Sequence, residues 1–311
     1  MRVLIALGGN AMTAPDGRAR PEDQIAAVAK AVEPVADLVA EGVDVVLTHG
    51  NGPQVGNLLV KNELAAAVVP PVTLDWCGAQ TQGTIGFILI NALERALGAR
   101  RIDRRIAAVV TRTRVDEHDP RFARPTKPIG RYLPAAEAQA MIEHGQNWED
   151  RGERGWRRVV ASPEPLEILD APAVEALIAA GFVVVATGGG GVPVVRDEAG
   201  TIRGVEAVID KDLAAALLGR TVGADVLVTA TDVEYVMLGY GTDDAKAVEL
   251  ADVRTMRGFA ADGHFAAGSM GPKVEAACRF IEQGGQRAVV TSLDQIAAAV
   301  HGEAGTEIVP G

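Results

Sequence analysis

The sequence is poor in cysteine and in aromatic side chains, and it contains no hydrophobic run long enough to cross a membrane. Its 311 residues include two cysteines, Cys77 and Cys278, and neither belongs to a CxxC motif or to a metal-ligand spacing. So few cysteines favour reduced, buried thiols in a cytoplasmic protein without a resident metal site. Aromatic residues make up 4% of the chain, so aliphatic side chains must build most of the core.

The signatures of several enzyme classes are also missing. The chain has no GxxxxGK[ST], GxSxG or HExxH motif, so nothing in it supports a P-loop protein, an α/β-hydrolase or a zinc protease. Gly188–Gly191 follows an apolar run but does not continue as GxGxxG. The formal net charge is −11, and the arginines at 100–105 and at Arg157–Arg158 fit a solvated surface. We therefore expect neither a nucleic acid nor a membrane as a partner.

Apolar runs alternate with helical patterns along most of the chain. Strands are expected at 2–7, 43–48, 106–114, 182–187, 224–230 and 286–291. Helices are expected at 21–41, 53–67, 78–97, 172–180, 211–218 and 271–283. Pro34 should divide the first helix, and Asp170 is placed to cap the helix that follows it. Nearly continuous aliphatic strands are typical of a parallel sheet with both faces covered. The pattern predicts an α/β fold, a three-layer α/β/α sandwich around a mainly parallel sheet.

One region interrupts the alternation. Residues 116–165 are polar, charged and rich in proline, and a short helix is expected within them at 134–144. Pro125 and Pro128 flank Thr126-Lys127 and restrict the backbone there. Long irregular insertions are usually functional or disordered, and these prolines argue against disorder. We interpret 116–165 as an inserted, protruding subdomain or lid that carries Lys127, and a long surface excursion without a functional role is the alternative.

Two glycine-asparagine loops each follow a predicted strand. They are Gly8-Gly9-Asn10 and Gly50-Asn51-Gly52, and the glycines at 188–191 follow a third strand. Such loops can present backbone N–H groups to an anion. Because the carboxyl ends of parallel strands meet at one edge of the sheet, the three loops should converge there.

Two lysines lie where helices are expected to begin. Lys211 is flanked by Asp210 and Asp212, and Lys273 follows Gly271-Pro272. A lysine in a first helical turn opposes the helix dipole, which is easier to accept if it meets a phosphate. Exposed surface lysines beside a capping aspartate remain the simpler alternative. His49, directly before the second loop, fits a hydrogen-bonded core histidine. Glycine loops, lysines and Mg²⁺ are sufficient for phosphoryl transfer.

Seven segments in order resemble carbamate kinase, a family within the amino acid kinase superfamily. They are VLIALGGNA (3–11), THGNGPQVGN (48–57), TQGTIG (81–86), PTKPIG (125–130), GGGGVPV (188–194), GVEAVIDKD (204–212) and GSMGPKVEA (268–276). The resemblance covers the chain from residue 3 to about 310. It implies one amino-acid-kinase-type domain over 1–311, with a carbamate or carbamoyl-phosphate part at 1–220 and a nucleotide part at 221–311. It also implies a homodimer and reversible transfer between ATP and carbamate, with ATP/ADP and Mg²⁺.

The resemblance also assigns roles to individual residues. It implies that Lys127, Lys211, Lys273 and Asp210 are catalytic, with Asp210 orienting the lysines. Binding of the small substrate would involve Gly8, Gly9, Asn10, Gly50, Asn51, Gly52, Gly189 and Gly190. Binding of the nucleotide would involve Lys211, Asp212, Thr231, Asp232, Val233, Tyr235, Met270 and Lys273. No protein cluster dedicated to a metal is implied.

Two positions depart from the family pattern, and other functions compete. Gln80 stands where the family commonly has methionine, near the substrate or dimer side. Ala230-Thr231-Asp232 replaces a more usual turn, which leaves nucleotide preference open. The expected direction is ATP formation from carbamoyl phosphate in arginine or related nitrogen catabolism. The alternatives are another small-carboxylate kinase of the superfamily, a relative that synthesises carbamoyl phosphate, and a catalytically silent binding homologue.

Overall fold

The computed structural model describes residues 1–13, 20–266 and 268–311. The strands are β1 Arg2–Leu7, β2 Asp44–His49, β3 Ile106–Ala108, β4 Arg112–Arg114, β5 Lys127–Leu133, β6 Trp148–Asp150, β7 Trp156–Val160, β8 Glu167–Ile168, β9 Val183–Val185, β10 Val192–Arg196, β11 Ile202–Gly204, β12 Val226–Thr231, β13 Val236–Leu238, β14 Lys246–Val248, β15 Leu250–Asp252, β16 Arg287–Ser292 and β17 Thr306–Val309. The helices are α1 Pro21–Ala31, α2 Glu33–Ala40, α3 Gly52–Ala65, α4 Leu74–Ala99, α5 Ala135–Glu143, α6 Ala171–Ala179, α7 Lys211–Thr221, α8 Val253–Ala261, α9 Met270–Glu282 and α10 Ile296–His301.

Eight of these strands form the main sheet, in the order β15-β17-β16-β12-β1-β2-β9-β3. All neighbouring pairs are parallel except β16 and β17. The chain crosses from β1 to β2 on one side and later enters β12 on the other side. Such a reversal of strand order opens a crevice at the carboxyl ends of the strands, where ligands bind in open α/β sheets.

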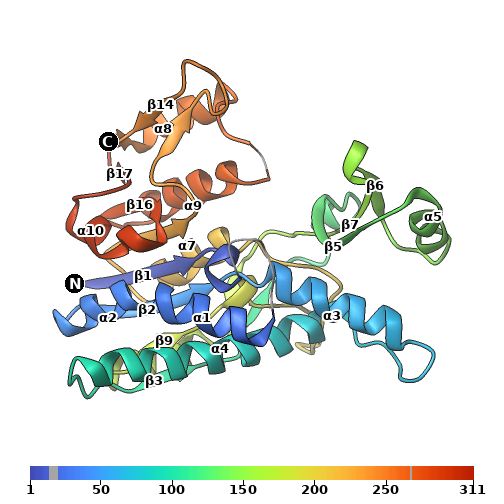
Figure 1. Cartoon of the computed structure of the whole chain (residues 1–311), viewed down its shortest axis with the longest axis horizontal. Helices are drawn as coiled ribbons and strands as arrows, with labels where there is room; N and C mark the ends of the chain where they lie inside the picture. The colour runs from blue at the N-terminus through green and yellow to red at the C-terminus, as the bar shows by residue number, and fades with distance from the viewer. Residues whose placement is uncertain (14–19, 267) are drawn as a thin grey trace.

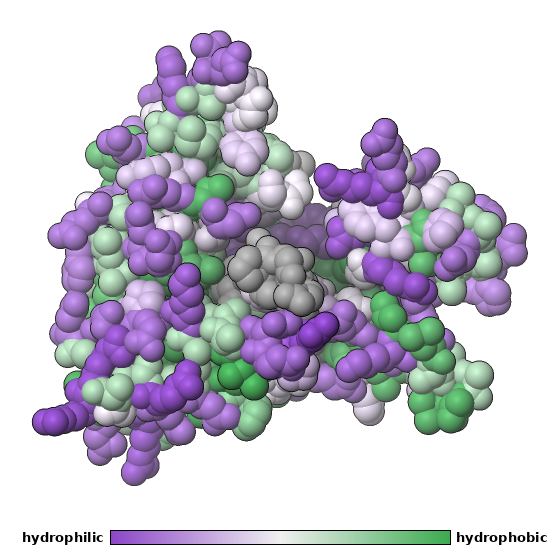
Figure 2. All heavy atoms as spheres, in the orientation of Figure 1, coloured by the Kyte–Doolittle hydropathy of each residue, from purple (hydrophilic) through white to green (hydrophobic). Residues whose placement is uncertain are grey.

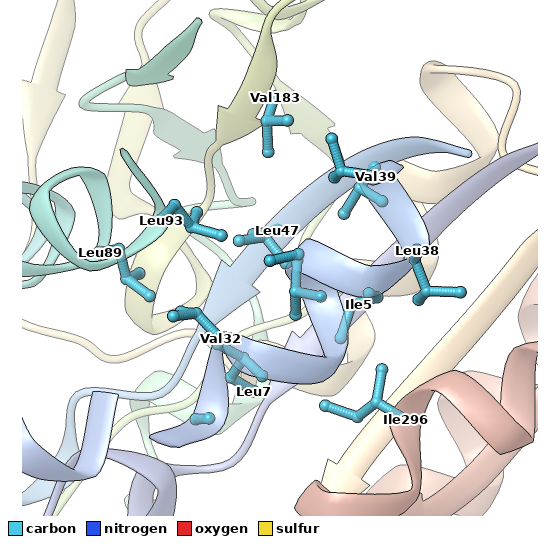
Figure 3. Packing of buried hydrophobic residues seen from close by; sticks show 14 of the residues in the cluster. Ile5, Leu7, Val32, Leu38, Val39, Leu47, Leu89, Leu93, Val183 and Ile296 are labelled. Carbon is cyan, nitrogen blue, oxygen red and sulfur yellow. The ribbon is translucent and has the colours of Figure 1, made fainter. Parts of the chain in front are cut away.

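The strand sequence divides the core into two layers, one on each face of the sheet. In β1, Val3, Ile5 and Leu7 enter a cluster with α1, α2, α4 and α10, as Figure 3 shows for Ile5 and Leu7. Leu4 and Ala6 of the same strand enter a second cluster with α6, α7, α8 and α9. Successive residues of a strand point to opposite faces, so an all-aliphatic strand can supply both layers. The predicted α/β/α sandwich is confirmed.

Most predicted elements agree with the structure, and two predictions need correction. The expected helix 21–41 is two helices that meet before Pro34, as predicted. The expected strand 106–114 is instead β3 in the main sheet and β4 in a second sheet of order β11-β10-β4-β8. Asp170 precedes α6 but makes no side-chain cap, because its carboxylate accepts hydrogen bonds from Arg112. Strands β13–β15 and helix α8 were not predicted.

The region predicted as an insertion contains a small sheet of its own. Strands β5, β7 and β6 pair antiparallel in that order, and α5 lies on the same side of the molecule (Figure 1). Leu133, Ala138 and Trp148 form a small cluster inside it. Ile129 and Val160 join a second cluster with Val55 of α3 and Leu74 of α4, which attaches the small sheet to the main body.

Candidate active site

The three glycine loops converge at the carboxyl ends of β1, β2 and β9. Together with β5, β7 and the starts of α7 and α9 they enclose a cavity of about 270 Å³. The residues around it include Gly9, Gly50, Asn51, Gly52, Lys127, Arg157, Gly189, Asp210, Lys211, Asp212 and Lys273. Figure 2 shows this face of the molecule hollowed between the part that carries α8 and β14 and the part that carries β5–β7. The predicted convergence of the loops is confirmed by their shared cavity.

Close packing explains why two of these positions must be glycine. A Cβ on Gly188 would lie 2.2 Å from Nε2 of His49, and one on Gly189 would lie 2.1 Å from Nδ2 of Asn51. Gly189 also has a φ of +66°, which side chains rarely adopt. The turn after β9 therefore rests directly on the loop after β2.

His49 is buried at the end of β2, beneath this contact. Its Nδ1 lies 2.9 Å from the carbonyl oxygen of Gly50 and donates to it. Burial lowers the pKa of His49 to about 4, the bond to Gly50 opposes this, and nearby Lys211 adds to the fall. The imidazole is therefore neutral at pH 7 and supports the second loop, as its interpretation as a core histidine predicted.

Side chains of α4 hold the loop residues in place. The amide Nδ2 of Asn51 donates to Oγ1 of Thr81 at 2.9 Å. Gln82 bonds both backbone groups of Thr111, at 2.9 and 3.1 Å. The hydroxyl of Thr111 accepts the N–H of Thr187 at 2.7 Å, immediately before the glycine turn. The only sign of these supports in the sequence was the TQGTIG segment.

Lys211 and Lys273 share one buried carboxylate. Nζ of Lys211 lies 2.5 Å from Oδ1 of Asp212, and Nζ of Lys273 lies 3.0 Å from Oδ2. Each lysine side chain is 14% exposed, and that of Asp212 is 5% exposed. The alternative of exposed surface lysines is therefore wrong. The prediction that Asp210 orients all the lysines also needs correction, because Asp212 is the partner of these two.

Asp210 forms an ion pair with the third lysine, Lys127. Nζ of Lys127, the first residue of β5, lies 2.8 Å from Oδ2 of Asp210. Oδ1 of Asp210 accepts the backbone N–H groups of Asp212 and Leu213, which caps α7. The Lys127 side chain is 36% exposed, more than twice as exposed as the other two lysines. The two aspartates on either side of Lys211 thus hold lysines from different parts of the molecule.

Burial and pairing oppose each other in the charges of this cluster. Burial would raise the pKa of Asp212, but Lys211 and Lys273 together lower it to about 2. Burial lowers the pKa of Lys211, with Lys273 adding to the fall and Asp212 opposing it. Two lysines against one carboxylate leave a net positive charge beside the glycine loops, which suits an incoming phosphate.

A second cavity of about 180 Å³ adjoins the first through Ser269 and Lys273. It brings together Thr231, Asp232, Val233, Tyr235, Met270 and Lys273 from the predicted nucleotide set, and it adds Met237, Tyr240, His264 and Phe265. The added residues come from β13 and from segments beside α8 that the sequence did not predict. Lys211 and Asp212 line the first cavity instead.

Gly8, Asn10 and Gly190 are the remaining predicted site residues. Gly8 directly follows β1, and its backbone N–H donates to the carbonyl oxygen of Ala230. Gly190 lies in the turn after β9. Asn10 belongs to the 3-10 helix Gly9–Met12, but its side chain lies outside the described residues. Arg157 was expected on the solvated surface and instead lines the first cavity.

Two kinds of feature were not found in the part of the chain that the structure describes. No group of three or more histidine, cysteine, aspartate or glutamate side chains is arranged to hold a metal ion. No described helix is both long and apolar enough to span a bilayer. Cys77 and Cys278 are both buried and unbridged.

Known proteins resemble this chain over its whole length. Residues 1–292 match the model of the amino acid kinase family. The chain is 42% identical to carbamate kinase of Pyrococcus furiosus, with 99% of each covered, and 44% identical to the carbamate kinase-like protein YahI of Escherichia coli, with 99% and 98% covered. Carbamate kinase of Giardia lamblia bound to AMP-PNP superposes with a TM-score of 0.94 at 39% identity, covering 100% of this chain and 98% of that one.

Proposed function

The chain belongs to the amino acid kinase family and, at full length, to its carbamate kinases, and we propose that its cleft transfers a phosphoryl group reversibly between ATP and carbamate through three lysines. The observation that carries this proposal is one cavity in which Lys127, Lys211 and Lys273 face the glycine loops. Phosphoryl transfer needs positioned positive charge more than covalent chemistry.

Each part of the cavity has a task in this transfer. The backbone N–H groups of the loops at 8–9 and 50–52 hold the small substrate and the transferring group. Lys211 and Lys273 neutralise phosphate oxygens, and Asp212 fixes both ammonium groups before the substrates arrive. Lys127 approaches from the small sheet and contacts the transferring group from the other side. A carbamate oxygen is already anionic, so the reaction needs no general base.

The acidic residues of the cleft are engaged within the protein, which fits a Mg²⁺ ion that arrives with the nucleotide and needs few protein ligands. Asp212 uses both carboxylate oxygens for lysines, and Asp210 uses its oxygens for Lys127 and the start of α7. Mg²⁺ commonly keeps several waters and binds substrate phosphates with few protein ligands. When bound, the ion would offset charge on the nucleotide phosphates. Asp210 and Asp212 line the cavity with their carboxylates, and they would hold the ion through water.

The second cavity is the proposed nucleotide site. Its aromatic and sulfur-containing side chains, from Tyr235, Met237, Tyr240, Phe265 and Met270, suit a flat base. Lys273 lines both cavities, which would place the nucleotide phosphates beside the small substrate. The expected direction is ATP formation from carbamoyl phosphate in arginine or related nitrogen catabolism.

We also propose that the protein is a homodimer, and an apolar stripe on α4 supports this. Trp76 and Phe87 are 62% and 63% exposed, and Val110, just beyond edge strand β3, is 52% exposed. Gln80 lies on the same exposed face of α4 as Trp76 and Phe87. A second copy that covers this stripe would remove the apolar surface from water. Light scattering on the wild type and on Trp76→Glu checks this, and a monomeric wild type would contradict it.

The enzymatic proposal is tested with purified protein, carbamoyl phosphate and ADP, with and without Mg²⁺. ATP should form, and formation should stop when the divalent cation is removed by a chelator. Acetyl phosphate and aspartyl phosphate serve as competing donors. Preference for one of these would favour the second candidate, another small-carboxylate kinase. The comparison of phosphoryl donors is needed because one relative of similar identity, YahI, is named only carbamate kinase-like.

A further inference from the structure

Two consecutive arginines of β7 have different surroundings. Successive residues of a strand point to opposite faces. Arg157 lines the cavity that holds the three lysines. Arg158 lines a separate cavity of about 540 Å³ and lies 3.8 Å from a carboxylate oxygen of Glu206. The pair therefore offers one arginine in the cleft and one outside it, on the same strand.

Arg157 has no carboxylate partner among the residues that the structure describes. Glu149 lies directly across the strand pair from it. The carboxylate of Glu149 is engaged elsewhere, because Nη2 of Arg151 lies 2.5 Å from its Oε2. Nε of Arg157 is buried and has no hydrogen-bond partner in the described structure. A partly buried guanidinium in this state lacks the anion that usually accompanies one.

An aromatic ring holds Arg157 in position without neutralising it. Its guanidinium carbon lies 5.1 Å from the centre of the Tyr132 ring, and Nη1 lies 3.5 Å from the Tyr132 hydroxyl oxygen. Stacking on a ring face leaves the N–H edge of a guanidinium free to bind an anion. Tyr132 comes from β5, the strand that begins with Lys127. The small sheet therefore presents two cations to the cleft.

We infer that Arg157 is a second substrate-binding residue of the lid, and that it binds the oxygens of the small anionic substrate opposite the glycine loops. The inference rests on the proposed function, because that function supplies carbamoyl phosphate as the ligand. Lys127 is already paired with Asp210 at 2.8 Å, whereas Arg157 is without an anion. A planar guanidinium can bind carboxylate or phosphate through two parallel hydrogen bonds, which a lysine cannot do.

Steady-state kinetics of Arg157→Met, Arg157→Lys and Arg158→Met test this inference. Arg157→Met should raise KM for carbamoyl phosphate about tenfold or more and leave KM for ADP within about twofold, since a charge-assisted contact to one substrate is lost. Arg157→Lys should fall between this variant and the wild type. Arg158→Met is the matched control, because it removes the same charge from the same strand outside the cleft. Circular dichroism checks that each variant is folded.

A binding measurement separates this inference from the proposed function. Phosphonoacetamide, a non-hydrolysable analogue of carbamoyl phosphate, is titrated calorimetrically into the wild type and the three variants. Weaker binding by about tenfold in Arg157→Met alone supports the inference. Equal affinity in Arg157→Met and Arg158→Met overturns it, even if the wild type makes ATP. If the wild type makes no ATP, the proposed function fails, and the titration still decides whether Arg157 binds the anion.

Discussion

The two sides of the cleft are built differently. The side formed by the main sheet has glycine turns in van der Waals contact, a buried histidine and two lysines that share the buried Asp212. The side formed by β5–β7 carries Lys127 and Arg157 on a small sheet that joins the body through the cluster around Ile129 and Val160. Charges on the first side are fixed before substrate arrives, and those on the second side are more exposed. The main-sheet side should therefore dominate stability, and the side formed by β5–β7 should act mainly on turnover.

Asp212→Asn should give the largest loss of stability. It leaves Lys211 and Lys273 buried without their shared carboxylate, and breaking a buried ion pair in this way costs about 3–5 kcal/mol. Urea unfolding of the variant and the wild type measures the difference. A loss similar to that of an exposed ion pair would show that the two lysines find other partners, and it would remove the proposed contrast between the two sides.

Acidification should destabilise the main-sheet side through His49. Its pKa is about 4 in the folded protein, below the ordinary value of 6.5, so the unfolded chain takes up a proton first. The contribution of His49 to stability is therefore complete above pH 6.5 and is lost as the pH falls towards 4. The shift corresponds to about 3 kcal/mol at most. Unfolding free energies from pH 7 to 4 should show a shallower slope in His49→Gln than in the wild type, and equal slopes would contradict the assignment.

Lys127→Ala should lower turnover without a matching loss of stability. Removing one preorganised charge from the transferring group costs about 10²-fold in kcat. Nucleotide affinity should change little, because Lys127 does not line the second cavity. Fluorescence titration with ADP, stopped assays with carbamoyl phosphate and urea unfolding measure the three quantities. A near-normal kcat would remove Lys127 from the transfer step.

Asp210→Asn should have the smallest effect on stability and is the counterpart of Asp212→Asn. Asparagine also accepts backbone N–H groups at a helix start, so the cap of α7 persists. The pair with Lys127 is partly exposed, and pairs of this kind contribute about 0–1 kcal/mol. Urea unfolding beside Asp212→Asn compares the two sides directly. A loss as large as that of Asp212→Asn would mean that charges hold the β5–β7 sheet as firmly as they hold the main-sheet side.

The parts of the site that lie at strand ends could be predicted from the sequence. Gly50-Asn51-Gly52 follows an aliphatic run, and parallel strands bring such loops to one edge by geometry alone. The carboxylate that pairs with each lysine could not be predicted in this way. Asp210 and Asp212 flank Lys211 equally in the sequence, and the helical start of α7 decides which carboxylate points to which lysine. Met237 of β13 and Tyr240 of the turn after it were missed because this segment carries no periodic pattern long enough to recognise.

Arg157 is the clearest case of a residue whose place the structure decided and the sequence did not predict. In the sequence it is one of two adjacent arginines in a charged insertion, and adjacent charges usually lie on solvated surface. In the structure it belongs to a strand, so its neighbour points away from it and the two meet different surroundings.

The sequence by itself determined the sheet, its two core layers, the positions of the glycine loops and the three lysines, because these depend on local apolar runs and on glycine. Tertiary structure decided which carboxylate holds each lysine, which arginine enters the cleft and which side chains line the second cavity. These depend on contacts between residues far apart in the chain, where strand pairing and burial, rather than spacing, set the distances.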